Sequence, residues 1–200
     1  MSPVLGAAVA YVIGAVPIGF LIARAFGVGD IRRHGSGNIG MTNVLRTAGK
    51  LPAILTLLGD VVKGALAVIA GGAVADAGVT GYAVSAVAAV AGNCWSVFLR
   101  FRGGKGVATG LGALLVLVKL ALVPAALVFL VVTLTTRYVS LGSLLASIGV
   151  PVVAWALGYP GPAVIASAVV AGIIVLRHRA NITRLLDGTE SRMGERTKIA

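Results

Sequence analysis

The chain has 200 residues and a formal net charge of +11, with 58% hydrophobic and 12% charged residues. Soluble domains contain roughly 45–50% apolar and about 25% charged residues, so this composition excludes an ordinary soluble protein. Because long apolar runs separate the basic residues, the charge indicates a membrane protein and not a nucleic-acid-binding one. A single cysteine and two histidines exclude a disulfide framework and a histidine-rich metal centre, and we expect neither a metal nor a cofactor.

The apolar runs predict membrane-spanning helices, each of about 20 residues. Residues 1–23 are uncharged and basic residues follow them, so the positive-inside rule places the N-terminus outside and residues 24–50 in the cytoplasm. Two further spans are predicted over residues 51–75 and 77–99. The second of these returns the chain to the cytoplasmic side.

The stretch 106–136 fits either one long helix or two short ones. One helix would leave the basic C-terminal tail outside, whereas two helices of about 13 and about 17 residues place nearly every basic residue except Lys119 in the cytoplasm. The uncharged stretch 138–176 adds two helices, divided by the turn at Pro160 and Pro162. We therefore predict an all-α, polytopic membrane protein: a single domain over residues 1–200, with seven transmembrane helices, the N-terminus outside and the C-terminus cytoplasmic.

Polar residues are concentrated in the first cytoplasmic loop, over residues 35–46, which holds three glycines, two hydroxyls, two amides and an arginine. Glycines let backbone N–H groups approach an anion closely, and a guanidinium matches the oxygens of a phosphate. We expect a phosphate site here, and a polar loop against anionic lipid is the alternative. The residues expected to bind are Gly37, Asn38, Thr42, Asn43 and Arg46.

A second glycine-rich segment, residues 101–110, opens the fourth predicted helix. It is not a nucleotide P-loop, because Leu99 stands where that motif requires glycine and Gly106 where it requires serine or threonine. A glycine turn with a lysine at a helix start still suits a phosphate without a metal. The expected contacts are Gly103, Gly104, Lys105 and Gly106.

The third polar segment is residues 177–190. Arg177, Asn181 and Arg184 share one helical face if the helix continues through them. His178 ordinarily titrates near neutral pH, and it is either a functional group or a solvated interface residue. We expect Glu190 to form a structural ion pair with an arginine.

Two opposite charges lie inside the second predicted span. Asp60 and Lys63 are three residues apart, share a helix face and can pair. An intramembrane ion pair is functional or organising by default. Together with the three loops, it predicts a pocket that is open to the cytoplasm and accepts phosphate groups. Such a pocket suits acylation of a phosphate-bearing headgroup or transport of an organic phosphate, and a lipid-binding structural protein is a third possibility.

These segments resemble the signatures of the bacterial acyl-phosphate:glycerol-3-phosphate acyltransferases, the PlsY family, and the resemblance covers nearly the whole chain. The matching stretches are Gly35-Ser36-Gly37-Asn38 through Thr42-Asn43 and Arg46, Leu58-Gly59-Asp60-Val61-Val62-Lys63-Gly64, Gly103-Gly104-Lys105-Gly106-Val107-Ala108-Thr109, His178-Arg179-Ala180-Asn181-Ile182-Thr183-Arg184-Leu185-Leu186 and Glu190. Three departures are Asn93 where the family usually has histidine, Arg102 where lysine is common and Met41 where alanine is common.

The resemblance implies transfer of a fatty acyl group from acyl phosphate to the 1-hydroxyl of glycerol 3-phosphate in the bacterial cytoplasmic membrane. Expected partners are acyl phosphate, glycerol 3-phosphate and membrane lipid, with no nucleic acid and no obligate protein partner. Arg46 and Lys105 are expected at the phosphates, and Asn181 and Ser143 complete the headgroup site. Ser36 is expected at the acyl carbonyl or the attacking hydroxyl. The general base is either His178 or the leaving phosphate.

Overall fold

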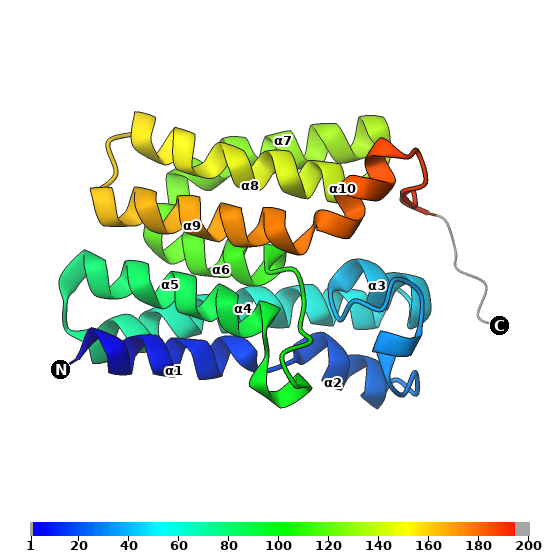
Figure 1. Cartoon of the computed structure of the whole chain (residues 1–200), viewed down its shortest axis with the longest axis horizontal. Coiled ribbons are helices and arrows are strands. Elements are labelled where there is room, and N and C mark those ends of the chain that lie inside the picture. The colour runs from blue at the N-terminus through cyan, green and yellow to red at the C-terminus, as the bar shows by residue number, and fades with distance from the viewer. Residues whose placement is uncertain (1, 195–200) are drawn as a thin grey trace.

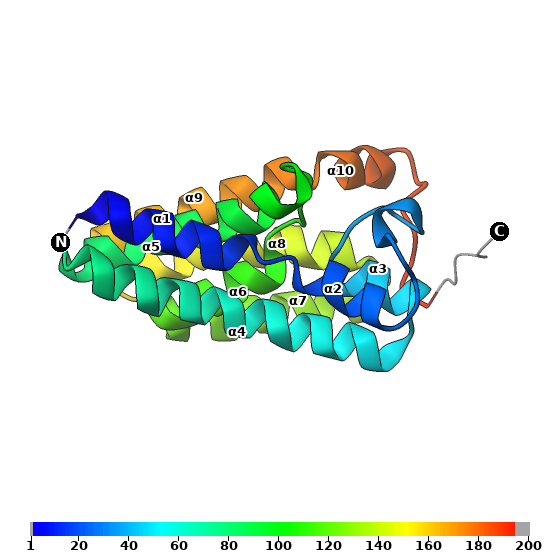
Figure 2. The same cartoon turned by 90° about the horizontal axis from the view of Figure 1, so that it is seen from below.

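The structure is a computed structural model that describes residues 2–194, and within that range its regular secondary structure is entirely helical. The long helices lie along one common direction (Figures 1 and 2). The N-terminus is at one end of the bundle, and the short helices α3 (Met41–Thr47) and α10 (Arg179–Leu186) gather at the other. The remaining α-helices are α1 Pro3–Ala15, α2 Ile18–Ala25, α4 Lys50–Ala75, α5 Gly78–Cys94, α6 Val107–Val118, α7 Leu122–Thr136, α8 Val139–Ala156 and α9 Gly161–Arg177.

Within residues 2–194, five helical segments are long and apolar enough to cross a membrane, and the bent pair α9 and α10 makes a sixth if counted as one. Helix α6 is apolar but shorter. The five segments are Pro3–Ala25, Lys50–Ala75, Gly78–Leu99, Lys119–Thr136 and Val139–Ala156.

The first apolar run is broken into α1 and α2 at Pro17. Helix α1 ends at Ala15, and carbonyl groups at the C-terminal end of a helix have no intrahelical N–H partner. The oxygen of Val16 accepts from Lys63 Nζ at 2.7 Å, and that of Ala15 accepts from Ser96 Oγ at 2.5 Å. The break therefore ties the first span to α4 and to the end of α5.

Residues 106–136 form two helices, as the sequence predicts. A single turn of 3-10 helix, Lys119–Ala121, separates α6 from α7, and the two helices run in opposite directions along the bundle (Figure 1). The predicted turn before Pro162 likewise separates α8 from α9. Helix α6 has only 12 residues, which is short for a complete bilayer crossing.

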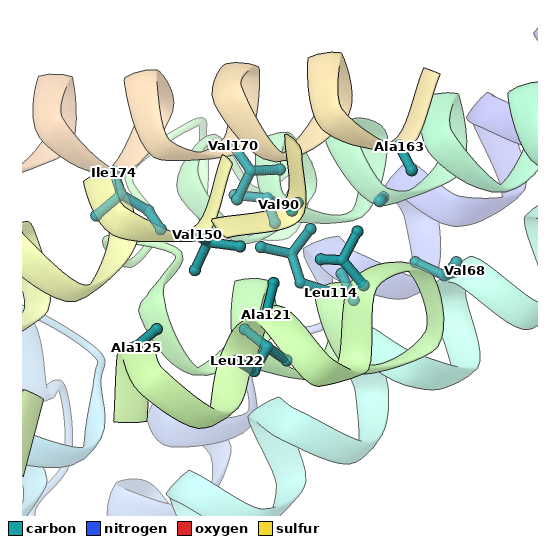
Figure 3. Close-up of a cluster of buried hydrophobic side chains, with 14 of the residues drawn as sticks. Val68, Val90, Leu114, Ala121, Leu122, Ala125, Val150, Ala163, Val170 and Ile174 are labelled. Atoms are coloured by element: carbon teal, nitrogen blue, oxygen red, sulfur yellow. The ribbon is translucent and has the colours of Figure 1, made fainter. Parts of the chain in front are cut away.

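Small residues allow the helices to approach closely, and larger ones fill the core. A Cβ on Gly64 of α4 would collide with the carbonyl oxygen of Thr109, and one on Gly112 of α6 with that of Val61. A core of buried aliphatic side chains joins α5, α6, α8 and α9 (Figure 3). Its central members include Val90, Leu114, Val150, Val170 and Ile174.

Arg177, Asn181 and Arg184 would share one helical face only if the helix continued through them, and it does not. Helix α9 ends at Arg177 and α10 begins at Arg179, with a bend of 60° between them. His178 stands at the corner with φ −96° and ψ 6°, outside the α-helical region. The bend separates the arginine at the end of α9 from the two side chains on α10.

Candidate active site

A cavity of about 630 Å³ lies at the end of the bundle that carries α3 and α10. Its size is within the range of small-molecule sites, which is about 300–1,000 Å³. Of the residues expected from the sequence, only Gly37, Lys63 and Gly103 lie outside its lining. Those that line it are Ser36, Asn38, Thr42, Asn43, Arg46, Asp60, Gly104, Lys105, Gly106, Ser143, His178, Asn181, Arg184 and Glu190.

The first loop is built around the buried side chain of Asn43. Its Nδ2 donates to the carbonyl oxygens of Asn38 at 2.8 Å and His34 at 3.0 Å, and its Oδ1 accepts from the N–H of Ser36 at 2.9 Å. Gly35 has φ +57°, and a Cβ there would collide with that Oδ1. The amide of Asn43 is thus hydrogen-bonded to the loop itself, and both Asn43 and Ser36 line the cavity.

The glycine turn, formed by Gly103 and Gly104, is hydrogen-bonded to the end of α5. The N–H of Gly104 donates to the oxygen of Asn93 at 2.8 Å, and that of Gly103 to Cys94 at 3.2 Å. A Cβ on Gly103 would also collide with the Asn93 oxygen. Both N–H groups are therefore engaged by carbonyl groups of α5 in this structure. Lys105 follows directly and lines the cavity.

A chain of short hydrogen bonds joins the second and third polar segments. Lys105 Nζ donates to Asn181 Oδ1 at 2.5 Å, and Asn181 Nδ2 donates to Glu190 Oε1 at 2.6 Å. Arg184 Nε pairs with Glu190 Oε2 at 2.7 Å, which is the ion pair expected for this acid. Ser140 Oγ also donates to Glu190, at 2.7 Å. Sequence reasoning missed Ser140, although it precedes Ser143 by three residues on one helical face.

Burial, neighbouring charges and hydrogen bonds shift the pKa values of Lys105 and Glu190. Burial of the ammonium group lowers the pKa of Lys105 to about 8, and the positive charges of Arg184 and Arg46 act in the same direction. The carboxylate of Glu190 opposes that shift. Burial also opposes ionisation of Glu190, but hydrogen bonds from Ser140, Asn181 and Arg184 prevail and lower its pKa. Lys105 is thus a cation that loses its charge in a mildly alkaline medium.

His178 and Ser143 are both buried and both bonded to their own helices. His178 Nδ1 lies 2.8 Å from the carbonyl oxygen of Ile174. Because a carbonyl only accepts, Nδ1 carries the hydrogen and Nε2 of the neutral ring presents a lone pair. Ser143 Oγ donates to the oxygen of Val139 at 2.8 Å, so its lone pairs are the groups it offers to a ligand.

The predicted intramembrane ion pair is present, and Asp60, but not Lys63, lines the cavity. Lys63 Nζ lies 2.7 Å from Asp60 Oδ1, and both side chains are buried. The ammonium also donates to the oxygen of Val16 at 2.7 Å and to Asn93 Oδ1 at 3.0 Å. All three of its donors are therefore used. Asn93 lies at the junction of the ion pair and the glycine turn, because its side chain accepts from Lys63 and its carbonyl group accepts from Gly104.

The remainder of the cavity is apolar and was not predicted. Leucines of α4, α6 and α7 line it together with alanines and a phenylalanine. In a chain so rich in apolar residues, no local sequence signal separates these side chains from those that face lipid. The apolar lining includes Leu57, Leu111, Leu114, Leu122, Ala125, Ala126, Phe129, Ala146, Val150 and Ile174.

A second cavity, of about 800 Å³, adjoins the first and shares Ser36, Asn38, Lys105, Asn181 and Arg184 with it. Its lining is strongly basic. Gly37 and Gly103, which do not line the first cavity, line this one, whereas Lys63 lines neither. Within residues 2–194, no group of three His, Cys, Asp or Glu side chains is placed to hold a metal ion. The cationic groups of this cavity are Arg32, Arg33, Arg100, Arg102, Lys105, Arg177 and Arg184.

Known proteins share both the sequence and the fold. The chain is 46% identical over 184 residues to a glycerol-3-phosphate acyltransferase of Syntrophotalea carbinolica, covering 92% of this chain and 93% of that protein. It is 47% identical over 197 residues to one of Desulforudis audaxviator, covering 98% of each. A crystal structure of PlsY, an integral membrane glycerol 3-phosphate acyltransferase in its glycerol 3-phosphate form, superposes with a TM-score of 0.89 at 38% identity over 96% of each chain.

A second crystal structure of that enzyme, in a lysophosphatidic acid form, matches with a TM-score of 0.87 and 37% identity over 96% of this chain and 95% of that one. The family model described as glycerol-3-phosphate acyltransferase matches residues 4–188, which include the first two polar segments, the third one up to residue 188 and the ion pair of α4. With sequence, fold and family model in agreement, the chain belongs to the PlsY family of integral membrane glycerol-3-phosphate acyltransferases.

Proposed function

We propose that this protein transfers a fatty acyl group from acyl phosphate to the 1-hydroxyl of glycerol 3-phosphate, giving lysophosphatidic acid and inorganic phosphate. The observation that carries the proposal is that the first cavity has two parts. One part is lined by cationic and hydrogen-bonding groups, and the other part is lined by apolar side chains. A phosphate-bearing headgroup suits the first part and an acyl chain suits the second. The crystal structures of the related enzyme with glycerol 3-phosphate and lysophosphatidic acid support the same assignment.

We assign the phosphates to Arg46 and Lys105, both of which line the cavity. Asn181 holds the ammonium group of Lys105 and, with Ser143, completes the headgroup site. Ser36 lines both cavities, so its hydroxyl is placed to meet the acyl carbonyl or the attacking hydroxyl. Binding in one cavity would then hold the two substrates next to each other and reduce the entropic cost of their encounter.

The reaction forms one carbon–oxygen bond and breaks another. The 1-hydroxyl oxygen attacks the acyl carbonyl carbon, the bond from that carbon to the phosphate oxygen breaks, and the hydroxyl proton leaves. Two groups can receive the proton: an oxygen of the departing phosphate, or Nε2 of His178. If His178 is the base, His178→Gln should lower kcat by about 10²–10⁴-fold. A smaller loss would assign the proton to the phosphate.

We further propose that the single domain crosses the bacterial inner membrane seven times, with the cavity facing the cytoplasm. The count adds the short helix α6 and the bent α9 to the five long segments. It predicts that Lys119 and Arg137 are on opposite sides of the membrane. In a Cys94→Ser background, a cysteine at residue 119 should react with an impermeant reagent from outside the cell and one at residue 137 should not. Same-side labelling would contradict the seven-span proposal.

The donor is tested with purified protein in lipid. Labelled glycerol 3-phosphate should become lipid-extractable with acyl phosphate as donor, without added metal, and not with acyl coenzyme A. The lipid product should have the mass of lysophosphatidic acid, with one phosphate released for each product formed. Product formation from acyl coenzyme A alone would overturn the assignment of the donor.

A further inference from the structure

Arg177 is a charged residue that the roles assigned above do not use. It is the last residue of α9 and is half-buried, and it lines the basic second cavity but not the first one. Its Nε donates to the carbonyl oxygen of Gly104 at 3.1 Å, and its Nη2 donates to that of Gly103 at 3.2 Å. The guanidinium carbon also lies 5.6 Å from the centre of the Trp95 ring. One planar group thus makes three contacts with a segment more than 70 residues away.

These contacts complete the restraint of the glycine turn. The N–H groups of Gly103 and Gly104 are held by the end of α5, and their carbonyl groups are held by Arg177. Lys105 comes next in the chain, and its ammonium group is bonded to Asn181, four residues after Arg177. Residues at the corner between α9 and α10 therefore restrain Lys105 in two ways. Arg177 holds the carbonyl groups of the two glycines before it, and Asn181 holds its ammonium group.

We propose that Arg177 is a positioning residue that fixes the glycine turn so that the ammonium group of Lys105 points into the cavity. The inference rests on the proposed function, because it makes Arg177 part of the phosphate site without direct contact to substrate. The role requires a guanidinium. A planar fork can donate to two successive carbonyl groups and stack on an indole at once, whereas an ammonium cannot reproduce that geometry. The role is therefore one of shape as well as charge.

Two variants separate shape from charge. Arg177→Lys keeps the positive charge but loses the fork, and Arg177→Gln loses both. Misplacement of a substrate-binding group by about 1 Å can cost about 10²-fold, so we expect both variants to lose about 10²-fold in kcat/KM for glycerol 3-phosphate. Arg24→Gln is the control, because Arg24 is likewise an arginine in the last turn of a helix but is exposed and lines neither cavity. It should stay within about twofold of the original protein.

A second readout does not depend on turnover. Reductive methylation of Lys105 over a range of pH, followed by mass spectrometry, reports the pKa of its amine, which is about 8 in the intact site. If Arg177 holds the turn, both variants release Lys105 toward water and shift the midpoint toward the ordinary value of about 10.4. If only the charge of Arg177 matters, Arg177→Lys keeps the midpoint near its original position. Unchanged midpoints in both variants would overturn the inference.

The two readouts distinguish failure of the inference from failure of the proposed function. If the unmodified protein forms no acylated product but the methylation midpoints shift as expected, the function is wrong and the positioning role stands. If product forms and Arg177→Lys behaves like the original protein, the positioning role fails alone. If neither Arg177 variant folds, Trp95→Leu removes only the stacking surface and should shift the midpoint in the same direction. No shift in that variant would contradict the role.

Discussion

Lys105 Nζ and Asn181 Oδ1 lie 2.5 Å apart, although 76 residues separate them in the chain. This hydrogen bond closes the polar part of the cavity, because Asn181 in turn donates to Glu190 at 2.6 Å. The amide thus uses its acceptor for the cation and its donor for the carboxylate, and keeps the two charges apart. An aspartate or an alanine at residue 181 could not make both contacts.

The pH dependence of activity should report Lys105. Its folded pKa is lowered to about 8, so the ammonium is charged below that pH and neutral above it. We expect kcat/KM for glycerol 3-phosphate to fall about tenfold for each pH unit above about 8, because this constant reports ionisations of the free enzyme. Lys105→Arg should move the loss beyond the alkaline range, since a guanidinium stays charged. A profile that is identical in the two proteins would contradict the phosphate role of Lys105.

Removal of Arg46 should weaken catalysis strongly. A desolvated charge contact costs about 2–5 kcal/mol when one partner is removed, which corresponds to roughly 30- to 4,000-fold in kcat/KM. Arg46→Lys should recover little, because an ammonium cannot form two parallel hydrogen bonds to a phosphate. Lys50→Ala is the control, since this exposed lysine lies four residues away and outside the cavity lining. Equal values of kcat/KM for Arg46→Ala and Lys50→Ala would show that the basic residues of the loop only set the membrane topology and do not bind phosphate.

The two members of the membrane ion pair should differ in their importance for stability. Lys63→Ala leaves the buried carboxylate of Asp60 without its 2.7 Å partner, which should cost about 3–5 kcal/mol of unfolding free energy. Asp60→Ala should cost less, because Lys63 keeps hydrogen bonds to Val16 and Asn93. The double variant should be more stable than the sum of the two losses predicts. Strictly additive losses, measured by denaturation in detergent, would show that the two residues are not coupled.

A larger side chain in the apolar part should change the preference for acyl chains. Ala146 is half-buried on α8 and lines the cavity, so Ala146→Phe would occupy space that we assign to the chain. Each methylene that is no longer buried costs about 0.8 kcal/mol, or about fourfold, so long-chain acyl phosphates should lose more kcat/KM than short ones. Ala168→Phe, on an exposed face of α9, should leave the ratio unchanged. An equal loss for all chain lengths would place the acyl chain elsewhere.

The helical architecture and the main polar groups could be predicted because they depend on local patterns. Charge placement indicated two helices between residues 106 and 136, and the structure contains both. The spacing of Asp60 and Lys63 indicated their pairing, which is present at 2.7 Å. The family resemblance, based on the three polar segments, is confirmed by the family model and by the related proteins.

What could not be predicted depends on contacts between distant segments. Arg177 at the end of α9 donates to the carbonyl groups of Gly103 and Gly104, and no spacing within 177–184 encodes those partners. The same holds for the N–H groups of the glycine turn, which are engaged by carbonyl groups of α5. The break at Pro17 within the first predicted span was not predicted, and its consequence, a carbonyl group offered to Lys63, depends on how the helices pack.

The most direct test of the account uses the protein reconstituted in sealed vesicles with acyl phosphate in the membrane and labelled glycerol 3-phosphate in the medium. An acyltransferase converts the label into a lipid that is extracted with organic solvent and has the mass of lysophosphatidic acid. Arg46→Ala in the same vesicles should reduce that product at least about 30-fold. Label that accumulates inside the vesicles as unmodified glycerol 3-phosphate, with no new lipid, would identify a transporter and contradict the account.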